Sequence, residues 1–226
     1  MSEVVRICLV GATGLVGTTL IREAVDRADV RIVGVTRREV TLPPGARMEM
    51  LLAEPSGWPD AIAEAKARVL VCALGTTWRK SGQDEMAFRA VDLDLVLNAG
   101  RSAREAGINH MIVVSSVGAD PGSRNRYLRV KGEMEHGLAK LGFKRLDILR
   151  PGLIRGRRAE RRRAERLGMW LSPIADLMLH GGYRKYRSIS VRSLAKAILI
   201  LTKEKAGGRF VHEYDSLRRV IRRSGG

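Results

Sequence analysis

The chain has 226 residues, of which 45% are hydrophobic and 29% charged, and its formal net charge is +17. This composition is that of a folded globular protein and argues against global disorder. A chain of this length buries most of its apolar surface in one core, so we expect a single domain over residues 1–226. No apolar run approaches the ~18 residues of a membrane span, and residues 1–14 do not resemble a signal peptide.

Apolar runs, glycine turns and amphipathic stretches alternate along the chain. The runs predict strands and the amphipathic stretches predict helices, an order typical of a doubly wound parallel α/β sheet with helices on both faces. The expected strands are residues 4–10, 31–36, 48–52, 68–74, 110–115 and 145–149. The expected helices are residues 14–27, 58–67, 84–106, 126–141 and 191–202. The rest of the C-terminal third is expected to be less regular and to end in a basic tail.

Two cysteines, Cys8 and Cys72, lie inside two of the expected strands. Neither has a second Cys or a His at metal-ligand spacing, so we expect buried, reduced thiols and no metal site. Reduced cysteines fit a reducing compartment. Together with the absence of a signal-peptide pattern, they predict a cytoplasmic protein.

The first expected strand runs directly into a glycine-rich turn, G-x-x-G-x-x-G, that opens a helix. Gly11 permits the tight turn, Gly14 lets the backbone approach a pyrophosphate, and Gly17 allows close packing of helix on strand. The helix N-terminus offers free N–H groups and partial positive charge to phosphates. We therefore expect a dinucleotide to be bound here by Gly11, Thr13, Gly14, Leu15, Val16 and Gly17.

Two arginines, Arg37 and Arg38, follow the second expected strand. An acidic residue at this place holds the ribose 2′-hydroxyl of NAD(H), whereas an arginine suits the 2′-phosphate of NADP(H). No acidic residue occurs between Arg31 and Arg38, so NADP(H) is preferred and NAD(H) stays possible. The alternative is that both arginines belong to a solvated loop.

A tyrosine and a lysine four residues apart, Tyr127 and Lys131, share one face of an expected helix. A cationic lysine stabilises a nearby phenolate, which makes the phenol a proton donor or acceptor near neutral pH. Ser115 and Ser116 end the fifth expected strand, at the edge where open parallel sheets bind ligands. A hydroxyl there can donate to a substrate carbonyl oxygen, and either serine fits this role.

Four stretches of the chain, residues 72–77, 115–120, 127–133 and 149–153, complete this picture. With the glycine turn, they resemble the atypical branch of the short-chain dehydrogenase/reductases over about residues 4–153. Within it, the chain is similar to the family of the human HIV-Tat-interacting oxidoreductase and to compact bacterial proteins called NAD-dependent epimerase/dehydratase-like. The resemblance implies a Rossmann fold and an NAD(P)-dependent oxidoreductase that acts on a carbonyl or an alcohol.

The resemblance also implies roles for the matching residues. Ser115 or Ser116, Tyr127 and Lys131 would form the catalytic group, and Lys131 would also touch the nicotinamide ribose. The residues that would further line or cover the cofactor are Ala73, Leu74, Gly75, Arg150, Pro151, Gly152 and Leu153. One departure is Asp92, which stands where the commoner branch has an asparagine. Another is the third expected strand, which ends without the usual Asp that contacts adenine.

Most of the excess charge lies in the C-terminal third. Residues 157–226 contain 18 basic and 6 acidic side chains, against 23 and 18 in residues 1–156. A solvated surface is the favoured explanation. Nucleic acid is not an expected partner, because residues 156–166 lack interleaved aromatic residues and a base-reading motif. Residues 154–190 are instead expected to form a substrate or lid region.

Two functions remain open from the sequence. The first is an NADP(H)-dependent oxidoreductase with an unidentified small-molecule substrate. The second is a regulatory or redox-sensing module that binds NADP(H) and signals to a protein partner without robust turnover. A homodimer is compatible with either function, and no membrane partner is expected.

Overall fold

The structure is a computed structural model that describes residues 4–46, 48–79, 81–156 and 180–223. Its centre is a seven-stranded sheet in the order β3-β2-β1-β4-β5-β6-β9, in which all neighbouring strands are parallel. The strands are β1 Val5–Val10, β2 Val30–Thr36, β3 Glu49–Leu52, β4 Val69–Cys72, β5 His110–Val114, β6 Arg145–Leu149 and β9 Gly208–His212. The predicted doubly wound parallel sheet is therefore confirmed.

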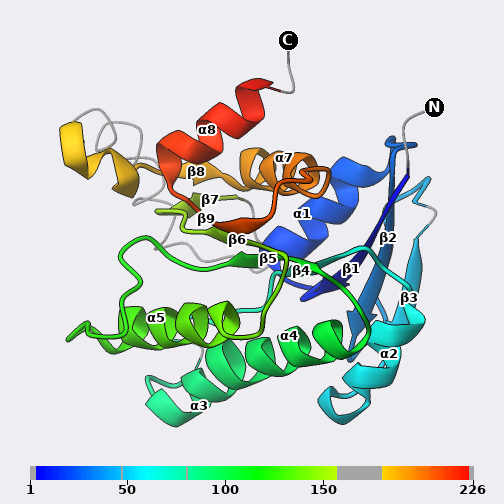
Figure 1. The fold of residues 1–226 in the computed structure, drawn as a ribbon, viewed down its shortest axis with the longest axis horizontal. Helices are drawn as coiled ribbons and strands as arrows, with labels where there is room; N and C mark the ends of the chain where they lie inside the picture. The colour runs from blue at the N-terminus through cyan, green and yellow to red at the C-terminus, as the bar shows by residue number, and fades with distance from the viewer. Residues whose placement is uncertain (1–3, 47, 80, 157–179, 224–226) are drawn as a thin grey trace.

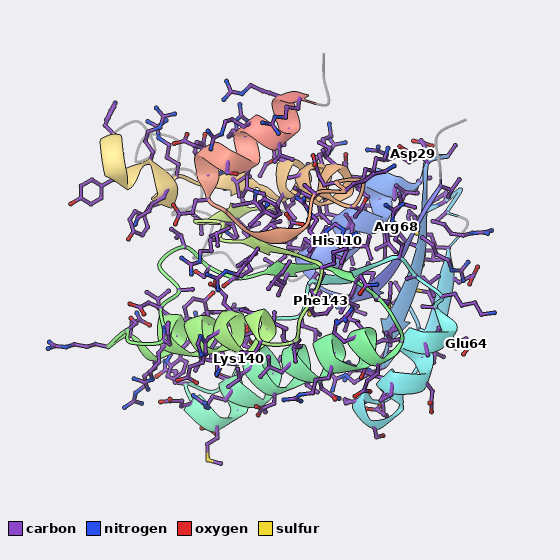
Figure 2. All side chains as sticks on the ribbon, viewed as in Figure 1. Asp29, Glu64, Arg68, His110, Lys140 and Phe143 are labelled. Carbon is purple, nitrogen blue, oxygen red and sulfur yellow. The ribbon has the colours of Figure 1, made fainter. Side chains whose placement is uncertain are left out.

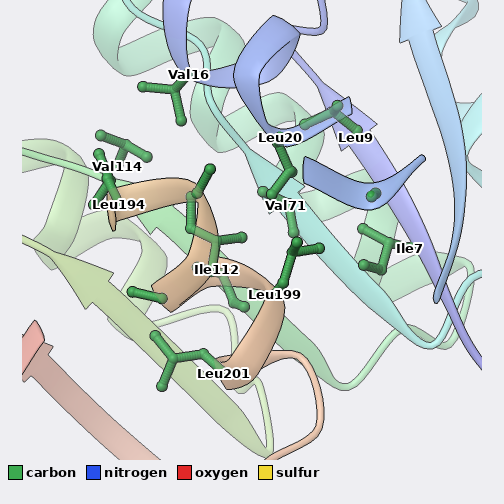
Figure 3. Close-up of a cluster of buried hydrophobic side chains, with 14 of the residues drawn as sticks. Ile7, Leu9, Val16, Leu20, Val71, Ile112, Val114, Leu194, Leu199 and Leu201 are labelled. Carbon is green, nitrogen blue, oxygen red and sulfur yellow. The ribbon is translucent and has the colours of Figure 1, made fainter. Parts of the chain in front are cut away.

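Helices cover both faces of this sheet (Figure 1). On one face lie α1 Leu15–Ala24, α7 Val191–Leu201 and α8 Tyr214–Arg223. On the other lie α2 Trp58–Glu64, α3 Glu85–Arg89, α4 Leu95–Glu105 and α5 Arg126–Ala139. Each face has its own buried apolar cluster, because successive side chains of a strand point to opposite faces. Figure 3 shows the first cluster, where Leu20 of α1 and Leu199 of α7 lie close to Val71 of β4.

The chain builds the sheet outward in two directions from β1. It places β2 and β3 on one side and then returns to lay down β4, β5 and β6 on the other. The strand order therefore reverses between β1 and β4, which pair side by side. Open parallel sheets bind ligands at the carboxyl ends of the strands at such a switch point.

The helix predicted over residues 84–106 is interrupted. The segment Ala90–Asp94 forms a π-type turn between α3 and α4, and it buries Asp92 and Leu93. The apolar spacing of this stretch predicts one continuous helix. The π-type turn cannot be seen in that spacing, because shifting the backbone hydrogen bonds by one residue leaves it almost unchanged.

The C-terminal end is basic as predicted, but the prediction that it is less regular is wrong. Strand β9 and helix α8 lie there, and a short pair is formed by β7 Ile154–Arg155 and β8 Ile189–Ser190. A 3₁₀ helix, η3, spans Gly181–Tyr186. These elements are too short to give a clear apolar pattern in the sequence. Helix α8 in addition buries only Leu217 and Val220, and most of its other residues are polar or basic. The predicted lid over residues 154–190 lies largely outside the described residues.

No helix in the described ranges combines the length and the apolar character that crossing a membrane requires.

Candidate dinucleotide-binding site

The glycine turn between β1 and α1 is closed by backbone contacts that only glycine permits. Gly11 has φ +91°, and a Cβ there would lie 2.6 Å from the backbone of Ala73, which follows β4. A Cβ on Gly17 would lie 2.2 Å from the carbonyl oxygen of Gly11. Through these close approaches the glycine turn packs against the end of β4. The first turn of α1 packs in the same way against the glycine turn. The glycine pattern read from the sequence therefore has a steric cause here.

The start of α1 leaves backbone donors open. Gly14 is the N-cap and supplies no side-chain cap. The N–H groups of Leu15, Val16 and Gly17 have no acceptor among the described residues. Thr13 and Gly14 are exposed beside them. Unpaired donors at a helix N-terminus, reached by an exposed and nearly side-chain-free turn, fit the diphosphate of a dinucleotide.

The arginine pair lies at the carboxyl end of β2, next to β1 in the sheet. Both Arg37 and Arg38 are exposed. The turn is fixed by Thr36, whose hydroxyl donates to the Arg38 carbonyl at 2.7 Å and accepts from its N–H at 3.2 Å. Neither guanidinium pairs with an acidic side chain in the described part of the chain. Both are thus free to take an anionic ligand.

Lys131 is buried on α5 against the segment that follows β4. Its Nζ lies 2.8 Å from Oδ1 of Asp92, and the two side chains are 5% and 0% exposed. Burial alone lowers the pKa of Lys131, but the negative charge of Asp92 and the nearby Tyr127 outweigh it and raise the pKa overall. Lys131 therefore stays a cation. A Cβ on Gly75 would lie 3.9 Å from its Nζ, which places the ammonium against the predicted cofactor-lining residues.

Tyr127 lies one helical turn before Lys131 and is partly buried. Its ring packs on Phe88 with the ring centroids 5.3 Å apart. The two side chains that the sequence predicted to share a helix face do so. The remaining predicted lining residues, Ala73, Leu74 and Gly75, follow β4 directly, and Gly75 is exposed.

The two serines after β5 have different surroundings. Ser115 is buried, and its hydroxyl donates to Oε1 of Glu135 at 2.5 Å. Glu135 is also clamped by Arg150, whose Nη2 lies 2.5 Å from its Oε2. Ser116 is only partly buried, and its hydroxyl makes a single long contact of 3.4 Å to the carbonyl of Val117. The structure thus separates two residues that the sequence could not distinguish.

The segment after β6 packs closely on the C-terminal part of the chain. A Cβ on Gly152 would lie 2.6 Å from the carbonyl oxygen of Tyr186. Pro151 is buried, whereas Leu153 is 52% exposed. Arg150, predicted as part of the cover, instead holds Glu135, so its guanidinium belongs to the Ser115 cluster.

Sequence reasoning missed Glu135 and Thr76. Glu135 stands eight residues after Tyr127 and four after Lys131, so the helical period could have indicated it. Nothing in the sequence indicates Thr76, whose backbone N–H donates to Asp92 Oδ2 at 2.8 Å.

Other parts of the described structure offer less to a ligand. A shallow hollow of about 330 Å³ lies between β9, α8 and η3. It is away from the glycine turn, and its lining mixes both signs of charge. No group of three or more His, Cys, Asp or Glu residues in the described ranges could hold a metal ion. Cys8 and Cys72 are buried, and burial raises their thiol pKa values to about 12 and about 11, so both stay protonated.

Solved structures similar to this chain have the NAD-binding Rossmann-like fold. A putative NAD-dependent epimerase/dehydratase from Bacillus halodurans matches with a TM-score of 0.69 and 21% identity, covering 97% of this chain and 99% of that one. MoeE5 in complex with UDP-glucuronic acid and NAD matches with a TM-score of 0.68 and 16% identity, covering 91% and 74%. The fold expected from the sequence is the fold of these proteins.

Curated relatives are more similar in sequence. The mitochondrial protein fmp52 of Emericella nidulans is 36% identical over 167 residues, which is 71% of each chain. The FMP52 protein of Saccharomyces cerevisiae is 34% identical over 183 residues, covering 80% of this chain and 76% of that one. Both are named as mitochondrial, so the prediction of a cytoplasmic protein is contradicted. Buried, reduced cysteines indicate a reducing environment but do not identify the compartment, which is why that prediction failed.

The family model described as HIM1 matches residues 60–180. This stretch includes β4, the π-type turn and α5, whereas the glycine turn and the arginine pair lie outside it. The match covers more than half of the chain and shows that it belongs to the HIM1 family, and the chain is also a sequence relative of the FMP52 proteins.

Proposed function

We propose that the protein is an NADP(H)-dependent oxidoreductase of the short-chain dehydrogenase/reductase type, acting on a carbonyl or alcohol substrate. One observation carries the proposal: α1 begins with open backbone donors directly after β1, and the buried cation Lys131 lies against the residues that follow β4, the strand beside β1. The first suits the diphosphate of a dinucleotide, and the second suits a ribose beside a reacting phenol.

The residues at the switch point between β1 and β4 fit the dinucleotide. Residues 11–17 would hold the diphosphate, because a backbone with open N–H groups and no obstructing side chain approaches it closely. Arg37 and Arg38 would hold the 2′-phosphate. Residues 73–75 would line the nicotinamide half, with Lys131 beneath it and residues 151–153 covering it. A nicotinamide bound there supplies or accepts the hydride at the substrate carbon.

The protein's own part in the reaction is proton transfer. When a carbonyl substrate is reduced, Tyr127 would give its phenolic proton to the carbonyl oxygen, which becomes the hydroxyl of the alcohol. The phenolate left on Tyr127 would take a proton back from water. Lys131 stabilises that phenolate through its positive charge.

Ser116, and not Ser115, is proposed to polarise the substrate oxygen. The Ser115 proton is committed to Glu135, so its hydroxyl has no donor left for a substrate. Replacing Ser116 with Ala should therefore lower kcat about 10-fold or more, by loss of one donor to the reacting oxygen. The same change at Ser115 is the matched control. It should mainly lower the melting temperature, because Glu135 loses a buried partner. Steady-state rates and thermal unfolding of both variants measure this, and a larger kcat loss in the Ser115 variant would reverse the assignment.

The choice of cofactor is proposed to rest on Arg37. A charge-assisted hydrogen bond contributes about 1.5–3 kcal/mol, so replacing Arg37 with Asp should weaken NADPH binding by about 10-fold or more. NADH lacks the 2′-phosphate, so its affinity should change far less. Fluorescence titration of wild type and variant with both cofactors measures the effect. The exposed Arg31, on β2 and beside Glu49, offers a control substitution outside the proposed phosphate site. Tighter binding of NADH than NADPH by the wild type would contradict the proposal.

The function as a whole is tested by two measurements on the purified chain. Titration with NADPH tests the site, and oxidation of NADPH in the presence of a panel of aldehydes and ketones tests the reaction. Binding without turnover of any panel member would favour the regulatory module. Failure to bind either cofactor would reject both functions. We also propose that residues 1–226 form a single domain and that residues 154–190 cover the substrate.

A further inference from the structure

A serine, a histidine and an aspartate form a hydrogen-bonded chain at the place where β9 leads into α8. Ser216 lies in the first turn of α8, and its hydroxyl oxygen is 3.0 Å from Nδ1 of His212, the last residue of β9. Nε2 of the same ring is 2.7 Å from Oδ1 of Asp147 on β6. The imidazole thus joins a hydroxyl to a carboxylate through its two nitrogens. A nucleophile, a base and a group that orients the base are the parts of an activated serine.

The carboxylate decides which nitrogen of the ring carries the proton. Burial raises the pKa of Asp147, but hydrogen bonds from two histidines and Arg145 outweigh it and hold the pKa well below its usual range. An ionised carboxylate only accepts, so Nε2 of His212 donates to it. In the neutral ring Nδ1 then has the lone pair, and the Ser216 hydroxyl donates to that nitrogen. A base within hydrogen-bond reach of the proton it removes has the required geometry.

The imidazole is held in place from several directions. The side chain of His212 is 8% exposed, and its ring stacks beside that of Phe210 with the centroids 6.5 Å apart. Its backbone carbonyl accepts the N–H of Arg150 at 2.9 Å. Arg145 binds the far side of Asp147 and balances its charge, so the part of the carboxylate is to orient the ring. A base fixed in this way is prepared to act without first rearranging.

The serine is accessible, whereas the two residues behind it are buried. Ser216 is partly exposed and lines the hollow of about 330 Å³ between β9, α8 and η3. His212 and Asp147 are buried. A hollow of this size is in the range of small-molecule sites. The order of exposure is the one that a serine nucleophile requires, because only its hydroxyl has to reach the substrate.

The rest of the lining indicates the class of substrate. Val211 is 43% exposed and offers an apolar surface. Lys185 and Arg219 supply positive charge, which suits the negative charge that develops on a carbonyl oxygen under attack. Glu213 and Asp215 also line the hollow and disfavour an anionic substrate. An uncharged carboxylic ester satisfies all of these conditions.

From this arrangement we infer that Ser216 and His212, positioned by Asp147, form a second catalytic site that hydrolyses small uncharged carboxylic esters. Nδ1 of His212 takes the Ser216 proton while the serine oxygen bonds to the ester carbonyl carbon. The proton passes to the alcohol oxygen as its bond to that carbon breaks, which leaves the acyl group on Ser216. Water then gives a proton to His212 and its oxygen attacks the acyl carbon. The carboxylic acid leaves as the same proton returns to the serine oxygen.

This site is separate from the proposed dinucleotide site. Strands β5 and β6 lie between β9 and β4 in the sheet. The inference therefore goes beyond the proposed oxidoreductase and does not depend on it.

Labelling of the wild-type chain tests the nucleophile directly. A fluorophosphonate forms a stable ester with an activated serine and releases fluoride, while the base takes the serine proton. Peptide mapping by mass spectrometry should find the phosphonyl group on Ser216. A serine and histidine that served only to hold β9 in place would leave Ser216 unlabelled, and that result would overturn the inference. The measurement needs no variant, so it stands even where a substitution prevents folding.

Hydrolysis of p-nitrophenyl acetate tests the reaction. Ser216→Ala should lower the rate by about 100-fold or more, the scale of general-base catalysis. Ser193→Ala is the matched control. Ser193 lies in the first turn of α7, is also partly exposed, and accepts a hydrogen bond from the Ser190 hydroxyl at 2.8 Å instead of contacting a histidine. Its variant should keep the wild-type rate.

A Ser216→Ala protein that hydrolyses the ester at the wild-type rate would also overturn the inference. Titration with NADPH separates this result from the proposed oxidoreductase. Ser216→Ala should bind NADPH as wild type does, because the substitution is far from the glycine turn along the sheet. A labelled Ser216 in a chain that binds no NADPH would uphold the ester site and reject the dinucleotide site.

Discussion

Tyr127→Phe should lower turnover of an active carbonyl substrate by ~10²–10⁴-fold, the usual contribution of a positioned general acid. The change removes one hydroxyl and keeps the ring. The packing on Phe88 at 5.3 Å uses the ring alone, so the fold should be unaffected. NADPH affinity should persist, because the residues proposed to bind the cofactor are the glycine turn, Arg37 and Lys131.

The measurement pairs kcat with NADPH titration on the same preparation. Tyr214 starts α8, outside the proposed dinucleotide site and outside residues 154–190, so Tyr214→Phe is the matched control and should match wild type in both readouts. A Tyr127→Phe protein that turns over at the wild-type rate would remove the tyrosine–lysine mechanism. The site would then bind a nucleotide without using Tyr127 and Lys131 in a reaction.

Local patterns in the sequence predicted most of the sheet and part of the site. Strand β4 is a continuous apolar run, and β1 and β5 are apolar except for Arg6 and His110, as is typical of buried parallel strands. The glycine turn could be predicted because its three glycines stand at fixed spacing directly after the first strand. That Tyr127 and Lys131 share a helix face could be predicted because four residues make about one helical turn.

Contacts between distant segments could not be predicted from the sequence. Ser115 meets Glu135 across 20 residues and Thr76 meets Asp92 across 16. Neither pair has a spacing that local geometry dictates, since each depends on how a helix packs against the sheet. Strand β9 was hidden for a related reason. It is a five-residue edge strand whose side chains are mostly exposed, and its one buried residue is His212, which is polar.

His212 leads to the largest expected effect on stability. Asp147 of β6 is fully buried and is surrounded by donors from three strands. Arg145 binds it through Nε at 2.6 Å and Nη2 at 2.8 Å, His110 through Nε2 at 2.8 Å, and His212 through Nε2 at 2.7 Å across 65 residues. Figure 2 labels His110, the first residue of β5. The carboxylate thus ties β9 to β6 and β5.

Asp147→Asn should destabilise the fold by about 3–5 kcal/mol, because it leaves the buried Arg145 guanidinium without its counter-charge. The substitution keeps the side-chain shape, so lost charge and not lost volume causes the effect. Urea unfolding at neutral pH measures it. The control is Asp215→Asn, which breaks a half-exposed pair with Arg184 and should change stability little. Equal effects of the two variants would show that the cluster does not hold β9.

The pH dependence of the same cluster has a definite sign. Burial raises the pKa of Asp147, but the hydrogen bonds from His110, His212 and Arg145 outweigh it, so the folded pKa lies well below the usual range. A carboxyl group with a lowered folded pKa stabilises the fold above its unfolded pKa of about 3.9 and loses that contribution as pH falls toward the folded value. The stability gap between wild type and Asp147→Asn should therefore be full at pH 6–7, as an approximate range, and should shrink below about pH 4. Urea unfolding across that range measures the gap, and a gap that stays constant into acid would show that the charge of Asp147 does not stabilise this fold.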